Sequence, residues 1–217
     1  MLRIEVGEDA GAAAAIAARV VADAIAAAAP RRFALAVSGG STPGEMFRLL
    51  AARDDVAWPL VDLFEVDERI APPGPDRNAA LLDSGLPERV AFHPIDVDAD
   101  DHEAAAEAYA ASLPGRFDLV HLGLGADGHT ASLVPGDPTA TVRDRDVVVT
   151  ATYRGHRRIT ITAPVIERAA LALFLVTGAD KRGALELLLA GDPSIPAGAL
   201  RLGDAVVVAD RAAAGAG

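Results

Sequence analysis

Short apolar runs of strand length alternate with helical stretches along this chain. Residues 33–37, FALAV, are continuously apolar, as expected for a strand covered on both faces. We expect further strands at residues 2–6, 60–66, 92–95, 118–122, 147–151, 159–162, 171–177 and 206–209. We expect helices at residues 12–29, 44–51, 78–82, 100–112 and 178–190, and a helix start at 162–167. This alternation predicts an α/β fold, a doubly wound and mostly parallel sheet with helices on both faces.

The length of 217 residues suits one α/β domain, which we expect to span residues 1–217. Hydrophobic residues make up 51% of the chain and aromatic residues only 4%, which favours helices laid over a sheet rather than an all-β sandwich. The chain has no cysteine, so it can form neither a disulfide nor a cysteine metal site. A cytoplasmic location fits this composition.

The net charge of -11 disfavours nucleic acid and anionic membranes as partners, because binding either needs clustered cations. An anionic small substrate must therefore meet locally concentrated positive groups. The Ala-rich stretch 12–29 is preceded by acidic residues and interrupted by Arg19 and Asp23. We interpret it as an amphipathic helix rather than a signal peptide or a membrane span.

A glycine-rich turn follows the strand at residues 33–37 and leads into a helix. Glycines expose backbone N–H groups, hydroxyls add donors, and a helix N-terminus favours negative charge. The turn, with Thr42 as the expected N-cap, therefore predicts a phosphate cradle, although an ordinary capped helix start is the alternative. It lacks the Lys of a Walker A loop. The cradle residues are Ser38, Gly39, Gly40, Ser41 and Thr42.

Three glycines, Gly123, Gly125 and Gly128, follow the strand at residues 118–122 and formally match G-x-G-x-x-G. A dinucleotide site is disfavoured, because this stretch lies past the middle of the chain and leads to Pro135 instead of a helix. Glycines at the carboxyl end of a parallel strand instead predict an open loop that can approach a ligand closely.

His129 lies in this loop two residues after Asp127, a spacing from which a carboxylate can orient an imidazole. An imidazole is well matched to general base work, so we favour His129 as a catalytic base over a structural or merely exposed histidine. A metal site on this pair is disfavoured, since no third ligand follows. We interpret the remaining histidines as structural or merely exposed: His93, His102, His121 and His156.

Charged groups follow two other strands. Asp67 and Arg69 end the strand at residues 60–66, where a solvated charge run is the alternative reading, and the Pro-rich segment after them is a candidate lid. Lys181 is the only lysine beside 19 arginines. It lies near the start of the helix expected at residues 178–190, where a compact ammonium can bind a phosphate. The alternative is that this lysine remains by chance and has no specific role.

Taken together, these motifs resemble the 6-phosphogluconolactonases of the family that also contains glucosamine-6-phosphate deaminases. The motifs that carry the resemblance are SGGSTP at 38–43, DER at 67–69, GLGADGHTASLVP at 123–135, RIT at 158–160 and TGADK at 177–181. Arg69 and the ending Ser132-Leu133-Val134-Pro135 resemble the lactonase branch, because the deaminases carry an aromatic residue after Asp-Glu and a Phe-Asn-Glu-Pro ending.

The resemblance implies a Rossmann-like fold and hydrolysis of 6-phosphoglucono-δ-lactone in the oxidative pentose phosphate pathway, without a metal or organic cofactor. It implies His129 as the general base, held by Asp127, with loop amides around Gly125 as candidate oxyanion donors. An amino-sugar phosphate isomerase and a non-enzymatic sugar-phosphate sensor are the alternatives. The oligomeric state stays open. The expected substrate-binding residues are Ser38, Gly39, Gly40, Ser41, Thr42, Asp67, Arg69, Gly125, Arg158 and Lys181.

Overall fold

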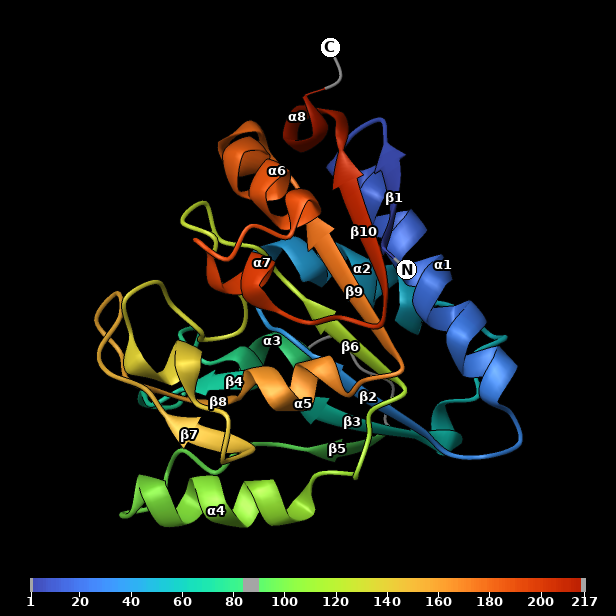
Figure 1. Cartoon of the computed structure of the whole chain (residues 1–217). Coiled ribbons are helices and arrows are strands. Elements are labelled where there is room, and N and C mark those ends of the chain that lie inside the picture. Colours follow the sequence, from blue (N-terminus) through green and yellow to red (C-terminus); the bar gives the residue numbers. More distant parts are fainter. Residues whose placement is uncertain (1, 84–89, 216–217) are drawn as a thin grey trace.

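A parallel sheet forms the centre of the protein (Figure 1), whose computed structural model describes residues 2–83 and 90–215. Within these residues the sheet has seven strands, and every neighbouring pair is parallel. In spatial order the strands are β1 (Leu2–Gly7), β10 (Asp204–Asp210), β9 (Leu171–Val176), β6 (Leu119–Leu122), β2 (Phe33–Val37), β3 (Val61–Glu65) and β5 (Ala91–His93).

Helices cover both faces of this sheet, and a hydrophobic core lies on each face. Successive residues of a strand contribute to opposite cores, as Leu35 and Ala36 do. On one face lie α1 (Ala10–Ala28) and α2 (Ser41–Ala51). On the other lie α4 (His102–Ser112), α5 (Ala163–Glu167), α6 (Arg182–Ala190), α7 (Pro196–Ala199) and α8 (Arg211–Ala214). The predicted doubly wound α/β fold is therefore confirmed.

The long helix α1 is apolar and long enough to span a membrane by length and composition alone. Asp9 caps its first turn by accepting a hydrogen bond from the N–H of Ala12 at 2.8 Å. One side of α1, including Val21 and Ile25, is buried in the core that it shares with α2 and the sheet, whereas Arg19 is exposed. This is the arrangement of an amphipathic core helix.

The connections of the sheet diverge between β2 and β6. After β2 the chain continues to β3 on one side, and after β6 it continues to β9 on the other side. In open α/β sheets such a point leaves a crevice at the carboxyl ends of the strands, where ligands bind. The glycine-rich turn 38–43 and the loop 123–135 both begin there.

A second, antiparallel sheet adjoins this crevice, and its strand order is β4 (Asp67–Arg69), β8 (Arg158–Ile161) and β7 (Val147–Val149). The sequence predicts that the DER segment, residues 67–69, follows a strand, whereas in the structure this segment is itself the strand β4. Val66 joins the two sheets, because its N–H donates to Val37 O and its carbonyl accepts from Ile161 N, both at 2.9 Å. The small sheet thereby carries residues of β4 and β8 to the mouth of the crevice.

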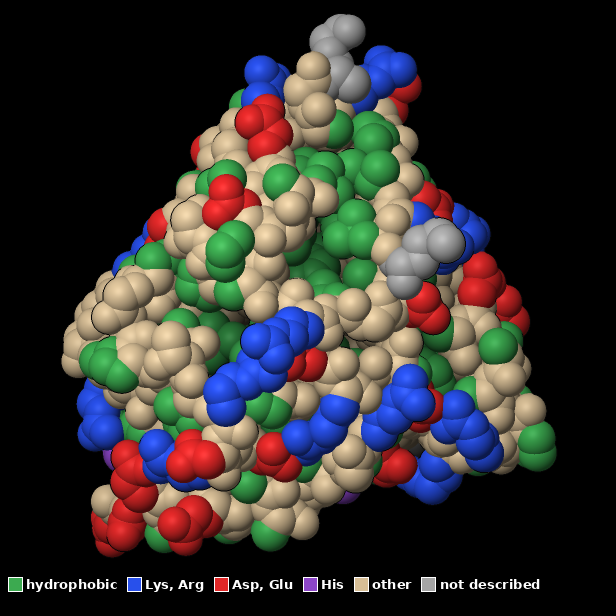
Figure 2. All heavy atoms as spheres, in the orientation of Figure 1, with side chains coloured by type: hydrophobic (Ala, Val, Ile, Leu, Met, Phe, Trp, Pro, Cys, Tyr) green, Lys and Arg blue, Asp and Glu red, His purple; other side chains and the backbone are tan. Residues whose placement is uncertain are grey.

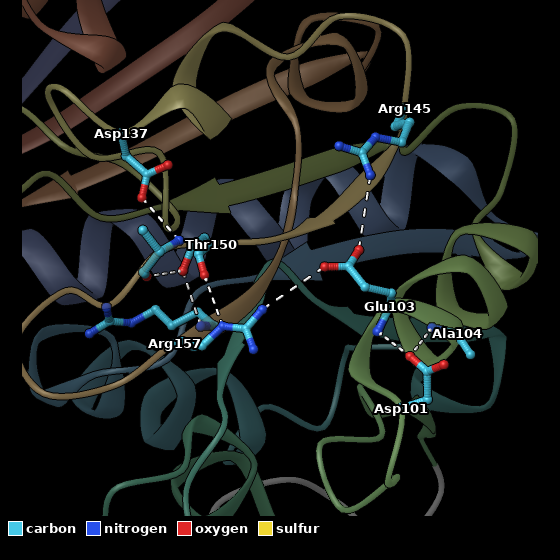
Figure 3. Close-up of polar contacts among 9 residues, drawn as sticks. Asp101, Glu103, Ala104, Asp137, Arg145, Thr150 and Arg157 are labelled. Carbon is cyan, nitrogen blue, oxygen red and sulfur yellow. Dashed lines mark hydrogen bonds and ion pairs between the residues drawn. The ribbon is translucent and has the colours of Figure 1, made fainter.

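Hydrogen bonds and ion pairs fix the strand ends of the small sheet, as Figure 3 shows around Thr150 and Arg157. The hydroxyl of Thr150 accepts from the N–H of Arg158 at 3.1 Å, and the Thr150 N–H donates to Arg158 O at 2.8 Å. Glu103 of α4 lies 4.0 Å from both Arg145 and Arg157. These exposed ion pairs add little stability, whereas the Thr150 bonds tie the backbone of Arg158 to the end of β7.

Candidate active site

The turn after β2 has the open backbone that a phosphate cradle needs. Ser38 donates two hydrogen bonds to His121 O, from its N–H at 3.1 Å and from its hydroxyl at 3.3 Å, which ties this turn to β6. Gly40 has φ +118, and a Cβ on Gly39 would lie 2.4 Å from Asn78 Cγ. Both positions therefore require glycine.

The expected N-cap at Thr42 is wrong, because α2 begins at Ser41 with Gly40 as its N-cap, two residues earlier than expected. Glycine has no side chain to cap the first turn, so Gly40 leaves the amides of this turn available for an anion. Thr42 lies within the first turn and lines the cavity described below. The side chain of Ser41 lies outside the described part of the structure.

The loop after β6 closes into a tight turn around its glycines. The N–H of Gly125 donates to His129 O at 2.8 Å, and the N–H of Gly128 donates to Gly125 O at 2.9 Å. A Cβ on Gly125 would lie 2.0 Å from His129 Nδ1, and a Cβ on Gly128 would lie 2.4 Å from Ile195 Cβ. Since both amides are used within the turn, neither is free to serve as an oxyanion donor; Gly125 instead makes room for the imidazole.

Asp127 holds the imidazole of His129 from one side. Its Oδ1 lies 2.6 Å from His129 Nδ1, and its Oδ2 accepts a hydrogen bond from the Tyr153 hydroxyl at 2.8 Å. Partial burial raises the pKa of Asp127, but the bonds from His129 and Tyr153 outweigh this and lower the pKa to about 2. An ionised carboxylate only accepts, so Nδ1 carries the proton and Nε2 keeps its lone pair in the neutral ring.

The DER strand places buried polar groups beside this pair. The Ser132 hydroxyl donates to Asp67 Oδ2 at 2.5 Å, and Asn78 Nδ2 donates to the carbonyl of Asp67 at 2.7 Å. Burial raises the pKa of Asp67, although the Ser132 bond and the charge of Arg158 oppose the shift. Glu68 is buried and accepts from the N–H of Asn78 at 2.8 Å, at the start of α3 (Asn78–Asp83). A solvated charge run is therefore the wrong reading of Asp67 and Glu68.

A cavity of about 260 Å³ joins these elements, and its wall is rich in cations: Arg69, Arg154, Arg158 and Lys181. Asp67 is its one acidic lining residue among those described, so positive charge is concentrated there in a chain of net charge -11. Lys181 belongs to a 3₁₀ helix, Ala179–Lys181, that precedes α6, and Nζ lies 3.1 Å from Asp180. The predicted residues that line the cavity are Ser38, Gly39, Gly40, Thr42, Asp67, Arg69, Gly125, His129, Arg158 and Lys181.

Asp127 does not line the cavity but supports His129 from behind. His121, interpreted from the sequence as structural or merely exposed, is fully buried under the turn at Ser38 and nevertheless contributes to the cavity lining. Asn78, from the candidate lid, packs against Gly39 and lines the cavity. Lid closure stays a prediction. Among residues 2–83 and 90–215, no three His, Asp or Glu side chains are grouped so that they could hold a metal ion.

Comparison with known proteins identifies the group of proteins to which this arrangement belongs. The family model described as Glucosamine-6-phosphate isomerases/6-phosphogluconolactonase matches residues 8–209. The chain belongs to this family. A 6-phosphogluconolactonase of Nostoc sp. is 37% identical over 175 residues, which are 73% of this chain and 72% of the relative. A 6-phosphogluconolactonase of Synechocystis sp. is 40% identical over 169 residues, 70% of this chain and 69% of the relative.

A solved structure of a devB protein resembles this family member over its whole length. The TM-score is 0.84 at 30% sequence identity, with 99% of both chains covered. Two sequence positions were expected to distinguish the lactonases from the deaminases: Arg69 and the motif ending that begins at Ser132. In this chain both residues line the cavity, and Ser132 is hydrogen-bonded to Asp67, which belongs to the same strand as Arg69.

The sequence did not single out Tyr153, Arg154 or Asn78 as site residues, yet all three line the cavity. Tyr153 lies 26 positions from Asp127 and reaches it only because the β7–β8 hairpin folds over the loop. Its ring lies edge-on to His129, with ring centroids 5.4 Å apart, and Arg154 and Arg158 lie over it. The sequence signal that could have identified Tyr153 was its place as an aromatic residue next to the turn Arg154-Gly155.

Proposed function

We propose that this chain hydrolyses 6-phosphoglucono-δ-lactone to 6-phosphogluconate in the oxidative pentose phosphate pathway. The observation that carries the proposal is the His129–Asp127 pair, whose imidazole opens onto a cavity walled by four cations. The names of the relatives from Nostoc and Synechocystis support the reaction. The substrate is then a phosphosugar lactone. The whole chain acts as one domain, and the cytoplasm is the expected location of the protein.

In the proposed mechanism Nε2 of His129 accepts a proton from a water molecule as the water oxygen attacks the lactone carbonyl carbon. The negative charge of Asp127 stabilises the imidazolium that forms. The tetrahedral intermediate then collapses, the ring C–O bond breaks, and the leaving alkoxide takes the proton back from Nε2. The imidazole returns to its starting state, so one water is consumed for each lactone opened.

Substrate binding is assigned to the cation-walled side of the cavity. The phosphate binds to the cradle residues Ser38 to Thr42, including the amides at the start of α2, and to the ammonium of Lys181. Arg69 and Arg158 bind the oxygens of the sugar acid, and Asp67 accepts hydrogen bonds from its hydroxyls. Fixing both ends of the molecule holds the carbonyl over the base, which supplies the proximity part of the rate enhancement.

The test is lactone disappearance measured with and without the protein, because the lactone also hydrolyses spontaneously. We expect the protein to accelerate the loss of the lactone with saturation by substrate. A coupled ammonia assay with glucosamine 6-phosphate is run on the same preparation, and we expect no ammonia. Ammonia release would support the amino-sugar isomerase instead, and binding of 6-phosphogluconate without any turnover would support a sugar-phosphate sensor.

A further inference from the structure

The first strand, β1, forms an edge of the seven-stranded sheet, and among the described residues it pairs only with β10. Its residues Leu2, Ile4 and Val6 are 40%, 43% and 44% exposed, and they are three of the four exposed large hydrophobic side chains in the described chain. Figure 2 shows hydrophobic side chains gathered in a hollow over β10 and β1. The strand therefore offers both an open hydrogen-bonding edge and an apolar face.

The opposite face of β1 carries two charges of opposite sign. Arg3 lies 3.8 Å from Glu5, and Glu5 accepts a hydrogen bond from Arg19 of α1 at 2.6 Å. Proteins usually protect an edge strand with charged side chains, a proline, a bulge or a covering segment. Like charges would repel a second copy of the strand, whereas a mixed pair can attract one.

The sequence of β1 is complementary to a second, antiparallel copy of the same strand. When two copies of residues 2–6, LRIEV, are laid antiparallel about Ile4, Arg3 of each copy faces Glu5 of the other. In the same register Leu2 faces Val6, and Ile4 faces Ile4. An antiparallel pair about a two-fold axis is the symmetric contact that gives a closed dimer.

We infer that β1 is an association surface for a second copy of this chain, which binds antiparallel about Ile4 and joins the two sheets into one. The edge N–H and C=O groups gain partners, and the exposed apolar side chains gain cross-strand contacts. The Arg3–Glu5 pairs set the register, although exposed ion pairs contribute little to affinity. No residue of β1 lines the cavity, so the inference is independent of the proposed function.

Cysteine cross-linking tests the contact, because the chain has no cysteine of its own. In the inferred dimer the Ile4→Cys side chains face each other within reach of a disulfide, so mild oxidation should give a covalent dimer at least about tenfold faster than in the control. The control is Leu189→Cys, at a 38% exposed position on α6. Equal rates for the two variants would overturn the inference.

The register is tested with Leu2→Cys and Val6→Cys. Mixed together, they should form the mixed disulfide, whereas Leu2→Cys alone should not, because its two copies lie roughly 13 Å apart along the strand. Self-linking of Leu2→Cys as fast as the mixture would overturn the register. Sedimentation equilibrium of the wild type should show a dimer that Ile4→Lys abolishes, with circular dichroism unchanged. A wild type that stays monomeric at the cross-linking concentration would overturn the association itself.

Discussion

Replacement of His121 by leucine should stabilise the protein, and should stabilise it more in mild acid than at neutral pH. His121 lies on β6 with its side chain fully buried, and neither ring nitrogen has a hydrogen-bond partner in the described structure. Phe47 lies edge-on to the ring, with centroids 5.9 Å apart. Burial lowers the pKa of His121 from 6.5 to about 4.

The expected gain has two parts. An unpartnered buried polar group costs about 1–3 kcal/mol, and leucine removes this cost at any pH. Between the unfolded pKa and the lowered pKa of the folded state, the unfolded chain binds a proton that the native protein excludes, so stability falls as the pH drops. At about 1.4 kcal/mol for each pKa unit, this loss amounts to about 2 kcal/mol at pH 5 and vanishes near pH 8.

Urea unfolding followed by circular dichroism at pH 8 and pH 5 measures both parts. The wild type and His121→Leu are compared at each pH, so that the titration of other groups cancels. His156→Leu, at a partly exposed position in the β7–β8 turn, controls for the loss of an imidazole as such. A variant less stable than the wild type at pH 8 would show that His121 has a partner, and an equal gain at both pH values would contradict the lowered pKa.

Substitutions at three further positions test the site by steady-state kinetics. Gly125→Ala would place a methyl group 2.0 Å from His129 Nδ1, so we expect kcat to fall about a hundredfold; wild-type kcat would contradict the packing argument. Tyr153→Phe removes the bond to Asp127, and we expect kcat to fall about tenfold at nearly constant KM, a split that simple misfolding would not give. Lys181→Ala should raise KM about tenfold and leave kcat unchanged, whereas Lys181→Arg should keep the charge and part of the substrate binding. An unchanged KM in Lys181→Ala would exclude this residue from the proposed phosphate site.

Glycine positions explain why much of the site could be predicted from the sequence. Gly39, Gly40 and Gly128 occupy backbone positions where a side chain would clash or force a strained φ, so their pattern marks turns at the carboxyl ends of strands. Apolar strand runs predicted the parallel sheet, because strands buried on both faces need no alternation. Together they place both turns in one crevice.

Contacts between distant segments explain what could not be predicted. Ser132 meets Asp67 across 65 positions, and Tyr153 meets Asp127 across 26, because the small antiparallel sheet folds against the loop after β6. A local pattern carries no information about such pairs. The prediction of Thr42 as the N-cap was wrong for a local reason, since the open backbone of Gly40 lets α2 start two residues earlier.

The most direct test of the account is the rate of lactone hydrolysis by His129→Ala, measured above the spontaneous background, together with binding of 6-phosphogluconate by calorimetry. We predict that turnover falls close to the background while the dissociation constant stays nearly unchanged, because the cations proposed to bind the phosphosugar are intact. His156→Ala is the matched control and should keep wild-type turnover. Wild-type turnover by a folded His129→Ala protein would contradict the central claim that this imidazole is the base.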